Sequence, residues 1–76
     1  MTREDWMENF GENLQEILTE KKIKQRQLSD LTKIPSSTIS DYITGKRMPS
    51  AEAIVKIVYA IDVDYFDLLD FSETID

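Results

Sequence analysis

The amino-acid sequence predicts an all-α protein of five short helices. Apolar residues recur at spacings of three and four along most of the chain, and strand signals are nearly absent. The chain has 76 residues, which is enough for one domain and too short for two. We therefore expect a single domain over residues 1–76, with a core over about 6–70 and an acidic tail at 71–76.

The first two helices are expected over residues 5–20 and 24–32. The first presents one apolar face made of Trp6, Phe10, Leu14, Ile17 and Leu18. Thr2 is a candidate N-cap, and the acidic residues after it suit a helix N-terminus. In the second helix, Leu28 and Leu31 are the expected inward residues.

The third helix is expected to begin near Pro35 and to run to about Thr44. The residue before a proline is pushed out of the helical region, and proline suits the first helical turn. Hydroxyls of residues 36–38 are candidate caps for this helix. Its inward residues are Ile39, Tyr42 and Ile43, and Gly45 is expected to end it in the left-handed conformation.

The fourth helix is expected to start after Ser50, a good N-cap residue. Its buried stripe is predicted to contain Ile54, Ile57, Val58 and Ile61, with Val55 as an extension. A short fifth helix is expected after a break at residues 62–64, with Asp64 as its cap. Its apolar residues are Tyr65, Phe66, Leu68 and Leu69.

Positive charge is confined to the middle of the chain. The formal net charge is −6, yet residues 1–19 carry −4, residues 20–50 carry +4 and residues 51–76 carry −6. A local basic surface, rather than the total charge, attracts a polyanion. The charge pattern is therefore compatible with double-stranded DNA as the partner, although such a run is also typical of a solvated helix face.

Several function classes lack support in the sequence. There is no cysteine and no histidine, so disulfides, thiolate metal sites and the commonest general base are excluded. No apolar run approaches the roughly 20 residues of a membrane span, and the N-terminus does not resemble a signal peptide. We expect a cytoplasmic protein that is not an enzyme, with no cofactor, metal site, small-molecule substrate or membrane contact.

The segment 27–50 contains the motif that indicates a function. Two short helices are joined by a tight turn, and Leu28, Ile34, Ile39 and Tyr42 sit where the pair must pack. The free face of the second helix fits the major groove, where each base pair presents a distinct pattern of donors and acceptors. Small polar residues on that face allow a close approach.

At this point the sequence resembles the lambda-repressor-like helix-turn-helix family, the phage repressor and Cro group also called the XRE family. The resemblance runs from about Phe10 to Leu69. Its most specific parts are Gln27-Leu28, Ser37-Thr38-Ile39-Ser40, Gly45-Lys46-Arg47 with Pro49-Ser50, and the closing Ala60-Ile61-Asp62-Val63-Asp64. The family fold implied is a compact five-helix domain with the helix-turn-helix at helices two and three.

The resemblance also implies roles for individual residues. Gln27 matches a position that holds the DNA backbone, and the outward residues of the third helix match positions that meet base edges. Residues at and after the end of that helix match phosphate contacts. The expected DNA-binding residues are Gln27, Ser36, Ser37, Thr38, Ser40, Asp41, Thr44, Lys46 and Arg47.

Two positions depart from the family pattern, and one further residue weakens the case for DNA. Ser29 stands where the family prefers alanine, and Lys33 where it prefers a glycine, so that Lys33 adopts a strained left-handed turn or the turn differs. Asp41 on the reading face is repelled by phosphates. It either accepts from a cytosine amino group, pairs with Lys46 or caps locally.

The implied function is a sequence-specific DNA-binding regulator, most simply a repressor that binds an inverted-repeat operator as a homodimer. Some of the apolar residues near the C-terminus must cover the core, and their excess suggests a dimer interface. Trp6 is expected in the core or at a subunit contact. The alternative is a protein-binding module, antitoxin-like or antirepressor-like, that keeps the fold without binding DNA. The acidic ends and Asp41 favour this alternative.

Overall fold

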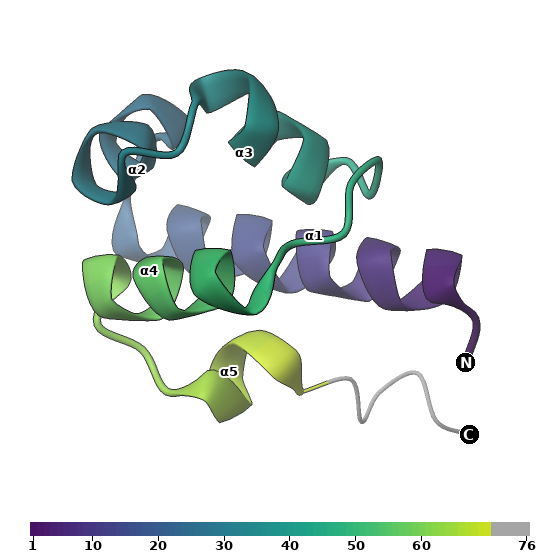
Figure 1. Ribbon diagram of the computed structural model, residues 1–76. Helices are drawn as coiled ribbons and strands as arrows, with labels where there is room; N and C mark the ends of the chain where they lie inside the picture. Colours follow the sequence, from purple (N-terminus) through teal and green to yellow (C-terminus); the bar gives the residue numbers. More distant parts are fainter. Residues whose placement is uncertain (71–76) are drawn as a thin grey trace.

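The computed structural model describes residues 1–70 and contains five helices in that range, with no strand (Figure 1). In chain order they are α1 (Arg3–Lys21), α2 (Gln25–Thr32), α3 (Ser36–Ile43), α4 (Ala51–Ile61) and α5 (Tyr65–Leu69). The predicted all-α class with five helices is confirmed. The predicted acidic tail at 71–76 lies outside the described residues.

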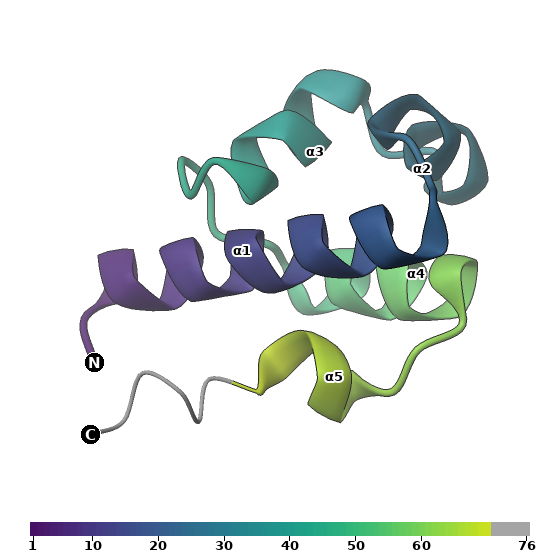
Figure 2. The same ribbon diagram turned by 180° about the vertical axis from the view of Figure 1, so that it is seen from behind.

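The helices lie in three levels that both ribbon views show (Figures 1 and 2). α2 and α3 lie on one side of α1 and α4, and α5 lies on the opposite side. α1 contacts α3 and α5, whereas α2 contacts α3 and α4. The helix pair that carries the motif therefore rests on the long first helix and on α4.

Local sequence signals explain where the long helices begin. The Thr2 side chain accepts a hydrogen bond from the Asp5 backbone N–H, and the Asp5 carboxylate accepts one from the Thr2 N–H, a capping box. This box starts α1 two residues earlier than predicted. Ser50 caps α4 by accepting from the Ala53 N–H at 3.0 Å, as predicted.

All five helices contribute to one apolar core. Its fully buried large side chains are Phe10, Leu14, Leu18, Leu28, Ile39, Ile57 and Leu68. Trp6 is half-buried and stacks on Phe10 with 5.4 Å between the ring centroids, so it lies at the edge of this core. The Asn13 side chain donates to the Leu68 and Asp70 carbonyl oxygens and ties the end of α5 to α1.

Two of the predicted inward residues were wrong. Leu31 is 60% exposed, because Thr32 occupies the inward direction at the end of α2, where its hydroxyl donates to the Leu28 carbonyl oxygen and accepts from the Ile34 N–H. Val55 is exposed, and Ile54 is only half-buried. The buried face of α4 consists of Ala53, Ile57, Val58 and Ile61, and it is narrower than predicted.

Gly11 lies at a close contact between α1 and α3 that the sequence pattern does not predict. It is buried, and a Cβ atom added there would lie 2.5 Å from the Tyr42 carbonyl oxygen and still closer to that of Ile43. No side chain fits between the two helices at this point. Gly11 therefore sets how closely the last turn of α3 approaches α1.

Lys33 adopts the left-handed conformation at the end of α2, with φ 63° and ψ 17°. Its N–H donates to the Ser29 carbonyl oxygen at 2.8 Å, so it closes the helix as a glycine would. Of the two alternatives stated for Lys33, the structure adopts the left-handed turn. A side chain in this region costs roughly 1 kcal/mol relative to glycine.

Replacing Lys33 with glycine is expected to raise the free energy of unfolding by about 1 kcal/mol. The melting temperature should rise by roughly 4–8 °C for a domain of this size. Thermal unfolding followed by circular dichroism measures both. Lys24→Gly is the matched control, because Lys24 has φ −83° and gains nothing from glycine. An equal effect of the two variants would contradict the strain at Lys33.

Candidate nucleic-acid interface

The turn between α2 and α3 is held by side-chain hydrogen bonds to its own backbone. The Ser29 hydroxyl donates to the Ile34 carbonyl oxygen at 2.6 Å across the turn. Serine thus replaces the expected alanine at this crossing and adds a bond. Leu28 and Ile39 are fully buried between the two helices. Burial of this apolar face turns the opposite, polar face of α3 outward.

The start of α3 differs from the prediction. Pro35 is the N-cap residue, with φ −55° and ψ 142°, and no side chain caps the helix. Ser36 and Ser37 lie in the first helical turn, are exposed, and make no hydrogen bond through their hydroxyls within residues 1–70. The predicted capping role of these hydroxyls is wrong, which leaves them available to an external partner.

The rest of the expected reading face is partly covered. Thr38 and Ser40 are half-buried, and Thr44 is exposed at the end of the helix. The Thr44 hydroxyl donates to the Ser40 carbonyl oxygen at 2.9 Å, so its proton already has an acceptor. Thr44 can still accept a hydrogen bond through its oxygen, whereas phosphate oxygens would require its proton.

The chain reverses direction after α3. Gly45 has φ 74°, as predicted, and packs against Glu8 of α1. The Lys46 N–H donates to the Asp41 carbonyl oxygen at 2.8 Å, and the loop brings the Arg47 guanidinium to 3.5 Å from the Asp41 carboxylate. Of the alternatives stated for Asp41, pairing with Lys46 is not found, because the reversal carries Arg47 and not Lys46 back to the carboxylate.

Gln27 lies at the front of α2 and is exposed. Its side-chain oxygen accepts from the Lys24 N–H at 2.8 Å, which fixes the amide over the first turn. The amide nitrogen keeps two N–H donors with no acceptor among residues 1–70. Lys24 and Arg26, which precede this position, are exposed and belong to the basic segment found in the sequence.

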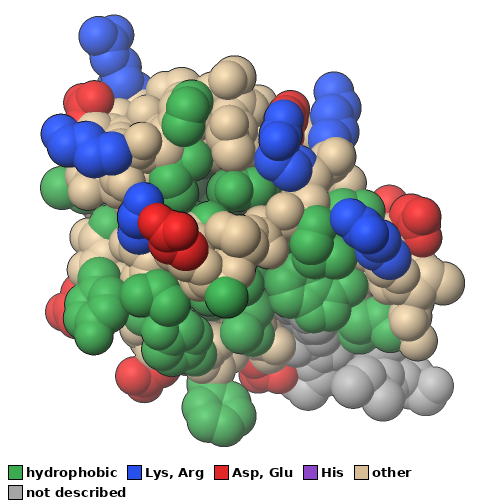
Figure 3. All heavy atoms as spheres, in the orientation of Figure 1, with side chains coloured by type: hydrophobic (Ala, Val, Ile, Leu, Met, Phe, Trp, Pro, Cys, Tyr) green, Lys and Arg blue, Asp and Glu red, His purple; other side chains and the backbone are tan. Residues whose placement is uncertain are grey.

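The space-filling view shows Lys and Arg side chains on both sides of the α2–α3 layer, with uncharged surface between them (Figure 3). Acidic side chains appear over the whole of that view, whereas the basic side chains gather in its upper part. The exposed cations of the middle segment are Lys21, Lys22, Lys24, Arg26, Lys33, Lys46 and Arg47. The positively charged segment seen in the sequence is thus exposed, and basic side chains lie on both sides of the α2–α3 layer.

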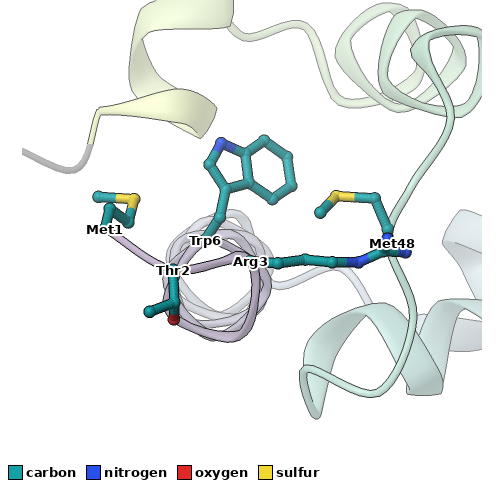
Figure 4. A pocket seen from close by; sticks show the side chains of 5 residues that line it. All are labelled: Met1, Thr2, Arg3, Trp6 and Met48. Carbon is teal, nitrogen blue, oxygen red and sulfur yellow. The ribbon is translucent and has the colours of Figure 1, made fainter.

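A hollow of about 330 Å³ lies between the start of α1 and the loop after α3, and it opens widely to solvent. Figure 4 shows its lining residues, with Arg3 extending toward Met48 while Trp6 points in another direction. Such an open surface does not enclose a small molecule as substrate sites do.

Over residues 1–70, no cluster of three or more metal-binding side chains is present. None of the described helices is both long and apolar enough to cross a membrane.

Comparisons with known proteins agree with this geometry. Residues 14–68 match the helix-turn-helix family, which is most of the chain. The crystal structure of the restriction-modification controller protein C.AhdI from Aeromonas hydrophila is similar to this fold with a TM-score of 0.78. The two sequences are 29% identical, and the match covers 82% of this chain and 94% of the controller protein. No curated protein matches the chain significantly.

The family match spans α2 and α3 with their turn, the two helices whose polar outer face and surrounding cations form the candidate interface. The lambda-repressor-like resemblance noted in the sequence is thereby confirmed. This chain belongs to the XRE family of helix-turn-helix proteins.

Proposed function

We propose that this DNA-binding transcriptional regulator is a repressor that binds an inverted-repeat operator as a symmetric dimer. The observation that carries the proposal is the outer face of α3, which carries short polar side chains and lies in a layer with Lys and Arg side chains on both sides (Figure 3). An α-helix of this kind fits the major groove, and the cations fit the phosphates on either side. A dimer bound at a promoter would exclude the transcription machinery.

The proposed contacts follow from the hydrogen-bonding groups of each side chain that have no partner within residues 1–70. Ser36 and Ser37 have unused hydroxyls and would meet base edges together with Ser40, while Thr38 would support them at the groove wall. Gln27 would donate its amide N–H groups to a phosphate. The remaining proposed phosphate contacts come from Lys46 and Arg47. Thr44 would join them by turning its hydroxyl proton from the Ser40 carbonyl oxygen to a phosphate oxygen. Few long side chains reach the bases, so DNA shape would supply part of the specificity.

The proposed dimer uses the apolar side chains that α4 and α5 leave exposed. Phe66 is 84% exposed and Tyr59 is 81% exposed, with Tyr65 and Val55 also accessible. Hydrophobic side chains are visible over α4 and projecting below α5 in Figure 3. Leu68 alone of the α5 residues is fully buried in the core, whereas most of the Phe66 side chain lies outside it. Exposed aromatic groups of this size are typical of an interface.

Replacing both Tyr59 and Phe66 with serine is expected to weaken self-association by about 100-fold or more, because each buried aromatic side chain contributes about 1.5–3 kcal/mol. Sedimentation equilibrium over a range of concentrations measures the dissociation constant. Leu31→Ser is the matched control, since Leu31 is also exposed but lies on α2. A wild-type protein that stays monomeric at all concentrations would contradict the dimer.

The function itself is tested by selecting tight binders from a randomised duplex pool at moderate salt. We expect an inverted repeat whose half-sites lie about 10 base pairs, or about 34 Å, apart. A single short site would keep DNA binding but make the monomer the functional unit. The absence of any enriched site, with the protein folded, would favour the alternative of a protein-binding module.

A further inference from the structure

The ion pair between Asp41 and Arg47 lies on the surface that the proposed function places against DNA. A carboxylate is unfavourable there, because the phosphates repel it. Asp41 lies on α3, and Arg47 lies in the loop that the proposed interface uses to contact phosphate. The Arg47 Nη2 atom is 3.5 Å from the Asp41 Oδ2 atom. The arginine that would add affinity is thus already paired with the acid that would reduce it.

The backbone positions this pair. The left-handed Gly45 turns the chain, and the Lys46 N–H bonds to the Asp41 carbonyl oxygen, so Arg47 returns to the residue whose side chain it meets. Both side chains remain accessible, with Arg47 57% and Asp41 36% exposed. Exposed pairs of this kind are weak, and an external anion can compete with them.

Resting on the proposed function, we infer that Asp41 is a specificity-determining residue that acts through Arg47. On unrelated DNA the carboxylate retains the guanidinium, because releasing it would leave Asp41 unpaired beside the phosphates. At the operator a donor on a base edge, such as a cytosine amino group, replaces Arg47 as the partner of Asp41. Arg47 then reaches a phosphate only at the matching sequence.

This exchange of partners predicts that the cost of releasing Arg47 from Asp41 differs between unrelated DNA and the operator. A phosphate alone must compete with Asp41 for Arg47, and it leaves a repelled carboxylate behind. A matching base pair removes that cost, so the ion pair lowers non-specific binding more than operator binding. The Asp41 carboxylate therefore contributes to selectivity although it carries the wrong charge for DNA.

The test measures binding of Asp41→Asn to two duplexes by fluorescence anisotropy at several salt concentrations. One duplex is the site selected from the randomised pool, and the other is its scrambled sequence. We expect the variant to bind the scrambled duplex about two- to fivefold more tightly, since exposed ion pairs are worth that much. The slope of log affinity against log salt on that duplex should steepen by about 0.9, because one more phosphate is contacted. Binding to the selected duplex should not improve.

Two controls separate this mechanism from a change in net charge. Asp30→Asn removes an exposed carboxylate of α2 that makes no ion pair within residues 1–70, and it reports the general effect of one charge. In an Arg47→Gln background, Asp41→Asn should have only the effect of Asp30→Asn. Asp41→Ser repeats the test should the asparagine variant fail to fold, as judged by circular dichroism.

Equal tightening on both duplexes by Asp41→Asn and Asp30→Asn would overturn the inference while leaving the proposed function intact. Persistence of the Asp41→Asn effect in the absence of Arg47 would overturn it as well. Failure of the wild-type protein to bind any duplex would instead overturn the proposed function, and this inference with it.

Discussion

Replacing Gly11 with alanine is expected to lower the free energy of unfolding by about 2–3 kcal/mol and the melting temperature by roughly 10–20 °C. The added Cβ would lie 2.5 Å from the Tyr42 carbonyl oxygen and 2.9 Å from the Ile43 carbonyl carbon. Both atoms belong to backbone at the end of α3 and cannot move aside as a flexible side chain does. Thermal and urea unfolding measure the loss.

The sign of this effect is diagnostic. At an unobstructed position inside a helix, glycine to alanine stabilises a protein by about 0.5–1 kcal/mol. An exposed neighbour on the same helix, Glu12, provides the control, and Glu12→Ala should change stability little. A neutral or stabilising Gly11→Ala would show that α1 and α3 are less closely packed. A folded variant with weakened DNA binding would further show that this contact positions the interface.

Reversing Lys46 and Arg47 together to glutamate is expected to weaken binding to the selected duplex by about 100-fold or more, because two charge-assisted contacts are replaced by repulsion. Binding to the scrambled duplex should weaken less, since only the Lys46 contact is lost there. The slope of log affinity against log salt should fall by about 1.8 on the selected duplex, where two phosphate contacts are lost, and by about 0.9 on the scrambled duplex, where Arg47 stays paired with Asp41. Part of the preference for the selected duplex should therefore be lost. Titrations of the selected and scrambled duplexes at several salt concentrations measure all three quantities.

Lys56→Glu serves as the control for charge reversal. Lys56 lies on α4, outside the segment that carries the basic surface, and is 3.0 Å from Glu52, so its reversal changes the net charge without removing a proposed contact. We expect a small, uniform loss of affinity from this variant. If the loss of DNA affinity per reversed charge were the same in the double variant as in Lys56→Glu, the loop after α3 would not be part of the interface.

Helix type and helix ends could be predicted from the sequence because they depend on residues close in the chain. Thr2 and Ser50 cap their helices through bonds to residues three positions away, and Gly45 and Lys33 end theirs through local backbone geometry. The capping prediction at Ser36–Thr38 was wrong for a local reason as well. Pro35 already occupies the N-cap position, which places the hydroxyls inside the helix.

The candidate site was only partly predictable. Charge segregation and the motif located it on α2, α3 and the following loop, where the structure finds exposed cations and free hydroxyls. The partner of Asp41 was not predictable, since Lys46 and Arg47 are adjacent and only the path of the loop decides which returns to the carboxylate. The same holds for Gln27, whose oxygen is used by its own helix.

By itself the sequence determined the five helices, the caps at Thr2 and Ser50, the family and the segment that holds the positive charge, since periodicity, capping and charge are properties of neighbouring residues. Asp64 is the N-cap residue of α5, as predicted, but its side chain makes no capping hydrogen bond. Only the tertiary structure decided that Leu31 and Val55 face outward and that Arg47 pairs with Asp41. It also decided that the missing side chain of Gly11 allows α3 to pack closely against α1. These outcomes depend on distances between segments far apart in the chain or on the exact path of a loop. Such distances follow from how the helices pack together, which no local pattern of residues encodes.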